Sequence, residues 1–196
     1  MRTILLIRHG ATAGNLEKRY IGRTDEPLCA LGESQAIALA PSLPQCDTVF
    51  SSPLLRCRQT AGILFPERKI NIIQDLRECD FGLFEGKNAD ELANDFAYNE
   101  WLATTCTAPI PDGEDVSAFR ARSIRAFANT AFSLPENYVV SFVLHGGCIM
   151  AIMEYFARPR RDFYNFHIGN CNYIMCTCEN KTLTITGIPT SNGTFT

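Results

Sequence analysis

Short apolar runs rich in β-branched residues alternate along this chain with segments of helical period, and this alternation restricts the fold to the α/β class. The runs predict strands at residues 3–7, 47–52, 70–73, 138–144, 171–178 and 182–188. Helical periodicity occurs at residues 32–43, 53–64, 90–102, 115–132 and 147–157. Such strands, separated by helices, are typical of a mostly parallel sheet covered on both faces, so we expect a three-layer α/β/α sandwich. The short "ENK" turn before the last run predicts an antiparallel hairpin at one edge.

Chain length and charge exclude several classes of protein. With 196 residues and no repeat or linker, the chain is expected to form a single domain, residues 1–196. The formal net charge is -3 and no block of Lys and Arg is present, so nucleic acid is not an expected partner. The first apolar run is too short for a signal peptide or a membrane span. We therefore expect a cytoplasmic protein without a membrane partner.

Nine cysteines raise the question of disulfides or a metal. Their odd number, in a chain without an export signal, indicates reduced thiols that are mostly buried as small hydrophobic side chains. Cys171, Cys176 and Cys178, with His167 nearby, are candidate zinc ligands. Strand alternation, however, puts Cys176 and Cys178 on one face, and their spacing does not match the usual zinc-binding pairs. The sequence therefore predicts strand positions here and no metal site.

Basic and imidazole side chains follow three of the predicted strands. They are Arg8 and His9 after the first strand, Arg56 and Arg58 after the second, and His145 after the fourth. Glycines follow both histidines, namely Gly10 after His9 and Gly146 and Gly147 after His145. The carboxyl ends of parallel strands share one edge of a sheet, so these residues are expected to converge in one positively charged crevice. Glycine turns followed by helices offer backbone N–H groups to an anion. Because the cations outnumber the charge of one carboxylate, we predict a phosphate ligand.

Six short motifs occur in the order found in one known family. They are "RHGAT", "YIGRTDEPLCALGESQA", "SSPLLRCRQTA", "LRECDFGLFEG", "PDGED" and "HGG", between residue 7 and about residue 149. "RHG" alone occurs by chance in many chains, whereas the ordered set does not. The set resembles the histidine phosphatase superfamily, in the branch of cofactor-dependent phosphoglycerate mutases, fructose-2,6-bisphosphatase and α-ribazole phosphatase. The resemblance implies a phosphoglycerate mutase-like fold.

The resemblance also implies roles for individual residues. His9 is the implied nucleophile, which forms a phosphohistidine, and Glu78 is the implied general acid. Arg8, Arg56 and His145 would hold the phosphoryl oxygens, because cations offset the charge of the transferred group. Further contacts with phosphate or substrate are implied for Asn15, Gly10, Thr12, Gly22, Arg23 and Gly146. No metal or other cofactor is implied, since arginines and a second histidine supply the charge.

Glu78 has two neighbours that could compete for the role of proton donor. Asp80 and Glu85 lie close to it in the sequence. The family pattern selects Glu78, which can protonate the leaving alkoxide and then activate the water that hydrolyses the phosphohistidine.

Three positions depart from the family pattern. Cys57 stands where Ala is common, Leu144 where Ser or Thr is common, and Met150 where Arg is frequent. None of these departures removes a catalytic residue, so they bear mainly on substrate preference. Arg56 and Arg58 beside Cys57 could lower the pKa of its thiol, but a packing role is expected.

The segment at residues 80–115 is expected to cover the crevice and to distinguish a phosphatase from a mutase. It contains nine acidic residues, one lysine (Lys87) and no arginine, a composition that would repel a second phosphate. Its aromatic residues should divide between helix core and pocket lining. They are Phe81, Phe84, Phe96, Tyr98 and Trp101. Arg19 and Arg23 could still bind a second anionic group, which keeps a cofactor-dependent phosphoglycerate mutase as an alternative.

The sequence therefore favours a metal-independent phosphomonoesterase that hydrolyses a small phosphorylated metabolite through a phosphohistidine. α-Ribazole 5′-phosphate is a candidate substrate, because its apolar base would suit an aromatic-lined cover. A non-catalytic phospho-ligand binding protein is a further alternative, although all five implied catalytic residues are present. The sequence does not distinguish a monomer from a homodimer.

Overall fold

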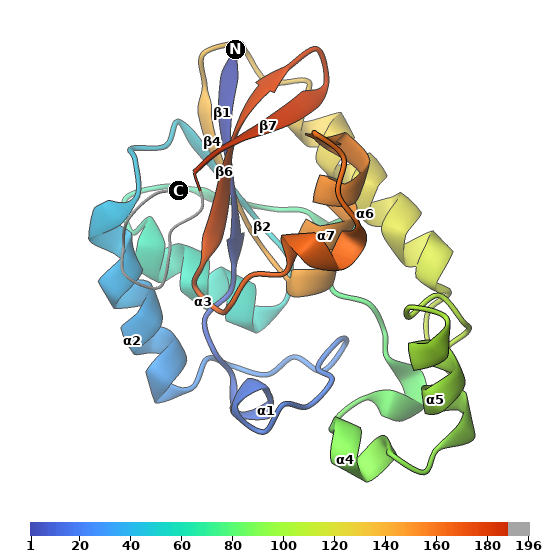
Figure 1. The fold of residues 1–196 in the computed structure, drawn as a ribbon. Coiled ribbons are helices and arrows are strands. Elements are labelled where there is room, and N and C mark those ends of the chain that lie inside the picture. The colour runs from blue at the N-terminus through green and yellow to red at the C-terminus, as the bar shows by residue number, and fades with distance from the viewer. Residues whose placement is uncertain (188–196) are drawn as a thin grey trace.

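A seven-stranded sheet forms the centre of the protein, with helices on both of its faces (Figure 1). The structure is a computed structural model and describes residues 1–187. The strand order across the sheet is β3-β2-β4-β1-β6-β7-β5. The strands are β1 (Arg2–Arg8), β2 (Thr48–Ser51), β3 (Ile70–Ile72), β4 (Val139–Leu144), β5 (Ala157–Arg158), β6 (Tyr173–Glu179) and β7 (Thr182–Gly187).

The sheet is mostly parallel, as predicted. β1, β4, β2 and β3 pair in parallel, and β5 pairs in parallel with β7. Only β6 runs against its two neighbours, β1 and β7. Residues 4–7 of β1 are fully buried, because helices cover both faces of the strand. This burial explains why the strand is an unbroken apolar run rather than an alternating one.

Two pairs of helices make the outer layers of the sandwich. The helices of the protein are α1 (Ala13–Leu16), α2 (Ala30–Leu39), α3 (Leu55–Leu64), α4 (Ala89–Leu92), α5 (Phe96–Ala103), α6 (Val116–Ala131) and α7 (Gly146–Phe156), with 3₁₀ turns η1 (Ala40–Ser42), η2 (Gln74–Leu76), η3 (Gly82–Phe84) and η4 (Phe163–Phe166). α2 and α3 pack on the face of β1 that carries Leu5 and Ile7. α6 and α7 pack on the face that carries Ile4 and Leu6. Within residues 1–187, no helix is long and apolar enough to cross a membrane.

The last two predicted strands form the antiparallel hairpin β6–β7, with Asn180 and Lys181 in the left-handed conformation at its turn (φ 47° and 58°). The hairpin is not at the edge of the sheet, because the two-residue strand β5 pairs with β7 outside it. β6 begins at Tyr173 rather than at residue 171, since Cys171 has a φ of 51° and donates its N–H to the end of β1. Residue 188, the end of the last predicted strand, lies outside the described residues.

The helix predicted at residues 90–102 is two short helices, α4 and α5, which Figure 1 shows at the lower right, away from the sheet. Asp95 starts the second helix, because its side chain accepts the N–H of Tyr98 as an N-cap. Asn88 and Glu91 form a capping box on the first helix. Local capping therefore divides a segment whose apolar period is continuous.

Five aromatic rings, two of them from α5, pack against one another, and we call them the aromatic cluster. Its members are Tyr20, Phe81, Phe84, Tyr98 and Trp101, with ring centroids between 5.3 and 6.4 Å apart. Phe84, Tyr98 and Trp101 are buried, as expected for helix core. Phe96, in contrast, is 82% exposed and belongs neither to this core nor to a pocket wall.

Candidate active site

Two histidines come together where neighbouring parallel strands end. His9 follows β1 and His145 follows β4, and the centroids of their rings are 5.2 Å apart. Both side chains are buried, at 4% and 0% exposure. The register of the sheet thus produces the convergence that the sequence predicted.

The imidazole of His9 is held as a neutral ring with one free nitrogen. Its Nδ1 lies 2.7 Å from the carbonyl oxygen of Gly10, which can only accept, so Nδ1 carries the proton and Nε2 keeps its lone pair. Burial, followed by the nearby charge of Arg56, lowers the pKa of His9 well below its ordinary value. A neutral imidazole with an available Nε2 is a competent nucleophile at neutral pH.

Arg56, in the first turn of α3, is 1% exposed. Its terminal nitrogens donate to the carbonyls of Thr24 (2.8 Å), Gly22 (2.9 Å) and Ile21 (3.2 Å). These bonds are to neutral groups, and Nε is buried without a hydrogen-bond partner. A buried cation in this condition fits an anionic ligand.

Arg8 shows the same pattern at the end of β1. Its Nη1 donates to the carbonyl of Ile168 at 2.7 Å, and its Nε is buried without a partner. Burial lowers the pKa of Arg8, against the opposing charge of Glu78. A Cβ on Gly146 would lie 3.7 Å from Arg8 Nε, so this guanidinium lies at the N-terminus of α7. Two guanidinium groups and a helix N-terminus can together hold a phosphoryl group.

Glu78 lies at the same helix terminus and is 8% exposed. Its two carboxylate oxygens accept the N–H groups of Cys79 (3.0 Å) and Gly147 (2.9 Å). Burial raises the pKa of Glu78, although these two hydrogen bonds and the charges of Arg56 and Arg8 oppose the shift. A carboxyl with a raised pKa can carry a proton closer to neutral pH and can donate it to a leaving group.

His145 is oriented by Ser52, at the end of β2. Its Nε2 lies 2.7 Å from the Ser52 hydroxyl. Burial lowers the pKa of His145 well below its ordinary value, and Arg56 and His9 act in the same direction. Cys57 Sγ lies 3.5 Å from the same Nε2. Burial raises the pKa of Cys57 to about 12 despite the adjacent Arg56, so the site holds a thiol and no reactive thiolate.

Asn15 and Thr12 form a reciprocal capping box at the start of α1, directly after His9. Asn170 reaches the same place from the loop before β6. Its Nδ2 donates to the His9 carbonyl (3.0 Å) and to Asn15 Oδ1 (3.1 Å). Gly10 donates its N–H to Thr60, at 3.0 Å. This loop is therefore held by side chains from three parts of the chain.

Gly22 and Arg23, for which the resemblance implies contacts with phosphate or substrate, have partners within the chain. Gly22 donates its N–H to Glu85 and passes so close to the next segment that a Cβ would lie 1.8 Å from the Cys79 carbonyl. Its contribution to the site is the carbonyl that holds Arg56. Arg23 has a side chain that is 64% exposed and lies 3.3 Å from Asp80 on the surface.

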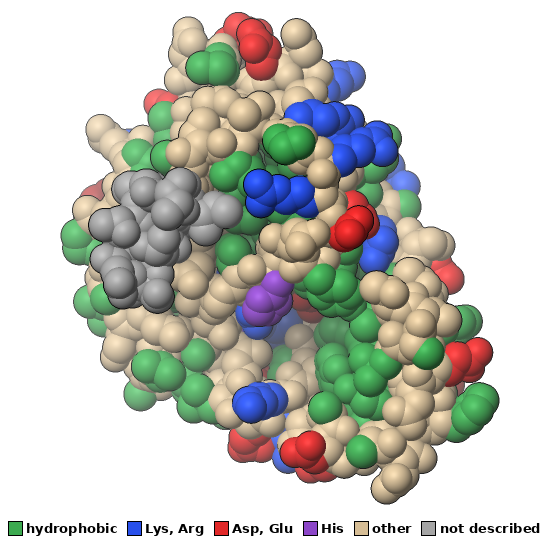
Figure 2. Space-filling view, viewed as in Figure 1, with side chains coloured by type: hydrophobic (Ala, Val, Ile, Leu, Met, Phe, Trp, Pro, Cys, Tyr) green, Lys and Arg blue, Asp and Glu red, His purple; other side chains and the backbone are tan. Residues whose placement is uncertain are grey.

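A cavity of about 450 Å³ opens beside Glu78 and Gly147. Its walls are mainly aromatic and aliphatic, with Phe119 from α6 and Trp101 from the aromatic cluster among them. Figure 2 shows the molecule hollowed beside a histidine side chain, with hydrophobic side chains gathered toward α5. In the described structure the charged residues lining the cavity are Glu78 and Arg120. Arg120 pairs with Glu154 at 3.1 Å and lies over a phenylalanine ring.

The nine acidic residues of segment 80–115 do not line this cavity, contrary to the expectation that they would repel a second phosphate there. Several of them bind backbone N–H groups as caps or turn partners, as Asp95 and Glu85 do. Others form ion pairs: Glu91 with Arg19 at 2.7 Å, and Glu114 with an arginine of α6. Arg19 is thereby engaged on the outside of the cover. Arg19 also does not line the cavity.

No group of three or more histidine, cysteine or acidic side chains is placed to hold a metal ion within residues 1–187. Cys176 and Cys178 lie on one face of β6 and are buried, as the strand alternation predicted. Seven of the nine cysteines are buried and two are half-buried.

The fold is that of the phosphoglycerate mutase-like proteins. The sequence matches the histidine phosphatase superfamily (branch 1) over residues 4–189, so the chain belongs to this superfamily, whose members are phosphatases or mutases. It is 33% identical over 187 residues to "Probable phosphoglycerate mutase GpmB" of Enterobacter sp. (strain 638), covering 88% of this chain and 86% of the relative. The alpha-ribazole phosphatase of Shigella flexneri is similar in structure, with a TM-score of 0.83, 26% identity and 96% of each chain covered. The phosphoglycerate mutase of Thermus thermophilus gives a TM-score of 0.72, with 31% identity and 92% and 95% of the two chains covered.

Sequence reasoning missed four polar residues around the site. Ser52 stands in a quoted motif and is the last residue of a predicted strand, so its position beside His145 could have been found from the sheet edge. Asn170, Arg120 and the buried Arg122 lie in segments without a motif, and no signal in the sequence distinguishes them from surface residues.

Proposed function

We propose that the protein is a phosphomonoesterase that transfers the phosphoryl group of a small phosphate ester to His9 and then to water, without a metal. The observation that carries this proposal is the pair of arginines, Arg56 (buried) and Arg8 (half-buried), each with a buried Nε that has no hydrogen-bond partner, next to a neutral imidazole. Two cations beside the single carboxylate of Glu78 leave an excess of positive charge in the site, which an anionic ligand can neutralise. The proposal treats residues 1–196 as one histidine phosphatase domain.

In the first step His9 Nε2 attacks phosphorus and the bond from phosphorus to the ester oxygen breaks. The Gly10 carbonyl accepts from Nδ1 and supports the positive charge that the ring develops. Arg8, Arg56 and His145 face the phosphoryl oxygens, while Glu78 gives its proton to the departing alkoxide. Glu78 suits this role because it borders both the helix terminus and the cavity that would hold the leaving group.

In the second step water attacks phosphorus and the bond to His9 Nε2 breaks. The Glu78 carboxylate takes the proton of the attacking water, which restores the acid, and His9 leaves as the neutral imidazole. Lowered proton affinity of His9 favours this departure, since the ring is released in the form that its surroundings prefer.

The cavity supports a substrate with an uncharged, partly apolar body, such as α-ribazole 5′-phosphate. Its aromatic walls offer apolar area to a flat base, and its one cation is already paired with Glu154. The likeness to the alpha-ribazole phosphatase of Shigella flexneri agrees with this choice.

A phosphoglycerate mutase is the second candidate, because Arg120 lines the cavity and a 33% identical relative carries that name. The two candidates differ in one assay. We expect α-ribazole 5′-phosphate to be hydrolysed with a higher kcat/KM than 3-phosphoglycerate. Interconversion of 3- and 2-phosphoglycerate that depends on 2,3-bisphosphoglycerate would instead support the mutase.

The test of the chemistry is rapid quench with p-nitrophenyl phosphate in the presence of a chelator. Wild-type protein should accumulate acid-labile phosphate on the peptide that contains His9, and His9→Ala should lose both this phosphate and hydrolysis. His167→Ala, which changes an exposed histidine, should still form the intermediate. Hydrolysis close to wild type by His9→Ala would contradict the proposal, and a complete lack of turnover by wild type would favour a phospho-ligand binding protein.

A further inference from the structure

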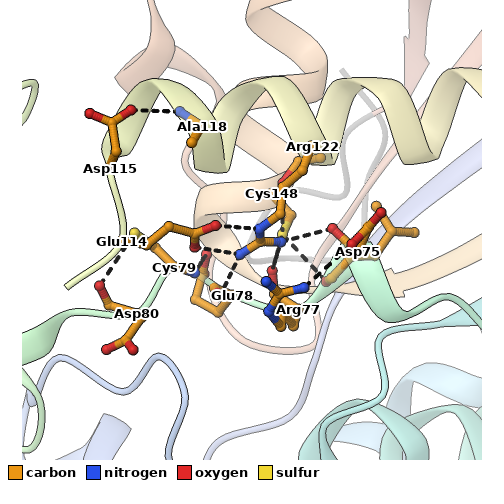
Figure 3. A network of polar contacts seen from close by, with 12 residues as sticks. Asp75, Arg77, Glu78, Cys79, Asp80, Glu114, Asp115, Ala118, Arg122 and Cys148 are labelled. Atoms are coloured by element: carbon orange, nitrogen blue, oxygen red, sulfur yellow. Dashed lines mark hydrogen bonds and ion pairs between the residues drawn. The ribbon is translucent and has the colours of Figure 1, made fainter.

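A buried arginine outside the phosphoryl site holds the segment that carries Glu78 (Figure 3). Arg122 of α6 is 6% exposed. Its five N–H groups meet five acceptors, namely the carbonyls of Asp75 (2.8 Å), Arg77 (2.7 Å) and Glu78 (2.9 Å) and the two carboxylate oxygens of Glu114 (2.6 and 2.7 Å). A guanidinium has no more than five donors, so none is left for a ligand.

We infer that Arg122 is a positioning residue for the Glu78 carboxyl, which it holds through the backbone on which Glu78 stands. The inference rests on the proposed role of Glu78 as proton donor. Asp75 lies in the short turn η2, and Arg77 and Glu78 lie between η2 and η3, where the chain forms no helix or strand that would supply regular partners for their carbonyls. Arg122 supplies those partners at three points within four residues. The position of Glu78 therefore depends on a side chain from a helix 44 residues away in the sequence.

The Glu78 carboxyl and the chain next to it are also held by α7. Gly147 donates its N–H to one oxygen at 2.9 Å, and the Cys148 thiol donates to the Arg77 carbonyl at 3.3 Å. Figure 3 shows Arg122 and Cys148 converging on the same short stretch of chain. A displacement of this stretch by about 1 Å would break the contacts of the carboxyl and would misalign it with a leaving group.

The chemistry of this network requires an arginine and a carboxylate. The planar guanidinium reaches three carbonyls and a bidentate carboxylate at once, whereas a lysine has three donors around one nitrogen. Glu114 neutralises the buried cation and donates its own N–H to the Asp80 carbonyl at 3.0 Å. Both members of the pair thus hold the chain around Glu78.

The test compares two esters with different leaving groups, phenyl phosphate and p-nitrophenyl phosphate, in single-turnover phosphorylation of His9. Phenolate is the poorer leaving group, so its departure depends more on a correctly placed acid. For Arg122→Lys we expect the rate constant with phenyl phosphate to fall about tenfold more than that with p-nitrophenyl phosphate. Glu78→Gln should show the same bias, and Arg125→Lys, an exposed change on the same helix, should show none.

A purely structural role predicts a different result. Loss of folded protein would reduce both rate constants equally, so equal losses for the two esters in a folded Arg122→Lys protein would overturn the inference. If Arg122→Lys does not fold, Glu114→Gln decides in the same assay, since it weakens the network and leaves the arginine in place.

The controls separate this inference from the proposed function. A wild-type protein that forms no phosphohistidine would overturn both. Leaving-group bias in Glu78→Gln but in neither Arg122→Lys nor Glu114→Gln would overturn the positioning role alone.

Discussion

Lowering the pH from 7.5 to 5.5 should destabilise the protein through His145. This side chain is fully buried, and burial together with Arg56 and His9 lowers its pKa well below 6.5. In the unfolded chain the imidazole has its ordinary pKa near 6.5 and takes up a proton as the pH falls, whereas in the folded protein it stays neutral. Protons then favour the unfolded state. The contribution of neutral His145 to the unfolding free energy is therefore complete above pH 6.5 and is lost as the pH falls below it. One such histidine lowers the unfolding free energy by about 1.4 kcal/mol between pH 7.5 and pH 5.5.

The assay is urea-induced unfolding of wild type and His145→Gln at pH 7.5, 6.5 and 5.5. Glutamine does not titrate and can still bond with the Ser52 hydroxyl. His9 adds to the loss at low pH, and Glu78, whose pKa is raised, acts with the opposite sign, but both are present in the two proteins. The difference in unfolding free energy should therefore shift by about 1.4 kcal/mol, with wild type losing more. A difference that stays constant with pH would refute the reasoning.

Three further predictions concern packing and reactivity. In urea titrations Gly22→Ala should lower the unfolding free energy by about 3 kcal/mol, because the added Cβ would overlap a carbonyl oxygen. Gly62→Ala is the control, because nothing lies within 4 Å of the added Cβ, and it should raise the unfolding free energy by up to about 1 kcal/mol. Trp101→Ala should lower the unfolding free energy by about 3 to 5 kcal/mol, because it removes a ring that contacts the other four rings of the aromatic cluster. An unchanged urea midpoint would contradict this prediction. Iodoacetamide at pH 8 should label the half-buried cysteines before Cys57, because burial raises the pKa of the Cys57 thiol to about 12. Mass spectrometry can measure the order of labelling.

The sheet could be predicted from the sequence because its signals are local. The run at residues 4–7 is apolar on every side chain, which a strand covered on both faces requires. Polar residues directly after such runs must lie at the strand ends, so the meeting of His9 and His145 followed from parallel pairing alone. The position of β5 could not be predicted in this way, because two residues carry no period.

The direction in which charged side chains point was less predictable. Counting acids in segment 80–115 indicated a repulsive lid, whereas Asp95 caps a helix and Glu85 binds three backbone N–H groups. Composition reports how many charges a segment has and does not report which of them its own backbone uses. The cation that lines the cavity, Arg120, comes from α6 and lies outside segment 80–115.

In the proposed mechanism the phosphoryl site and the leaving-group cavity share few residues, and this division has an evolutionary consequence. The walls near Trp101 and Phe119 do not include His9 or Arg56, so a lineage can change them and alter which ester it accepts while phosphoryl transfer continues. Under the proposed mechanism each intermediate in such a series keeps its phosphoryl site and stays visible to selection. Glu78 and Gly147 are exceptions, because both border the two compartments. Substitutions that change substrate preference are therefore tolerated at most cavity residues and are constrained at the residues next to the Glu78 carboxyl.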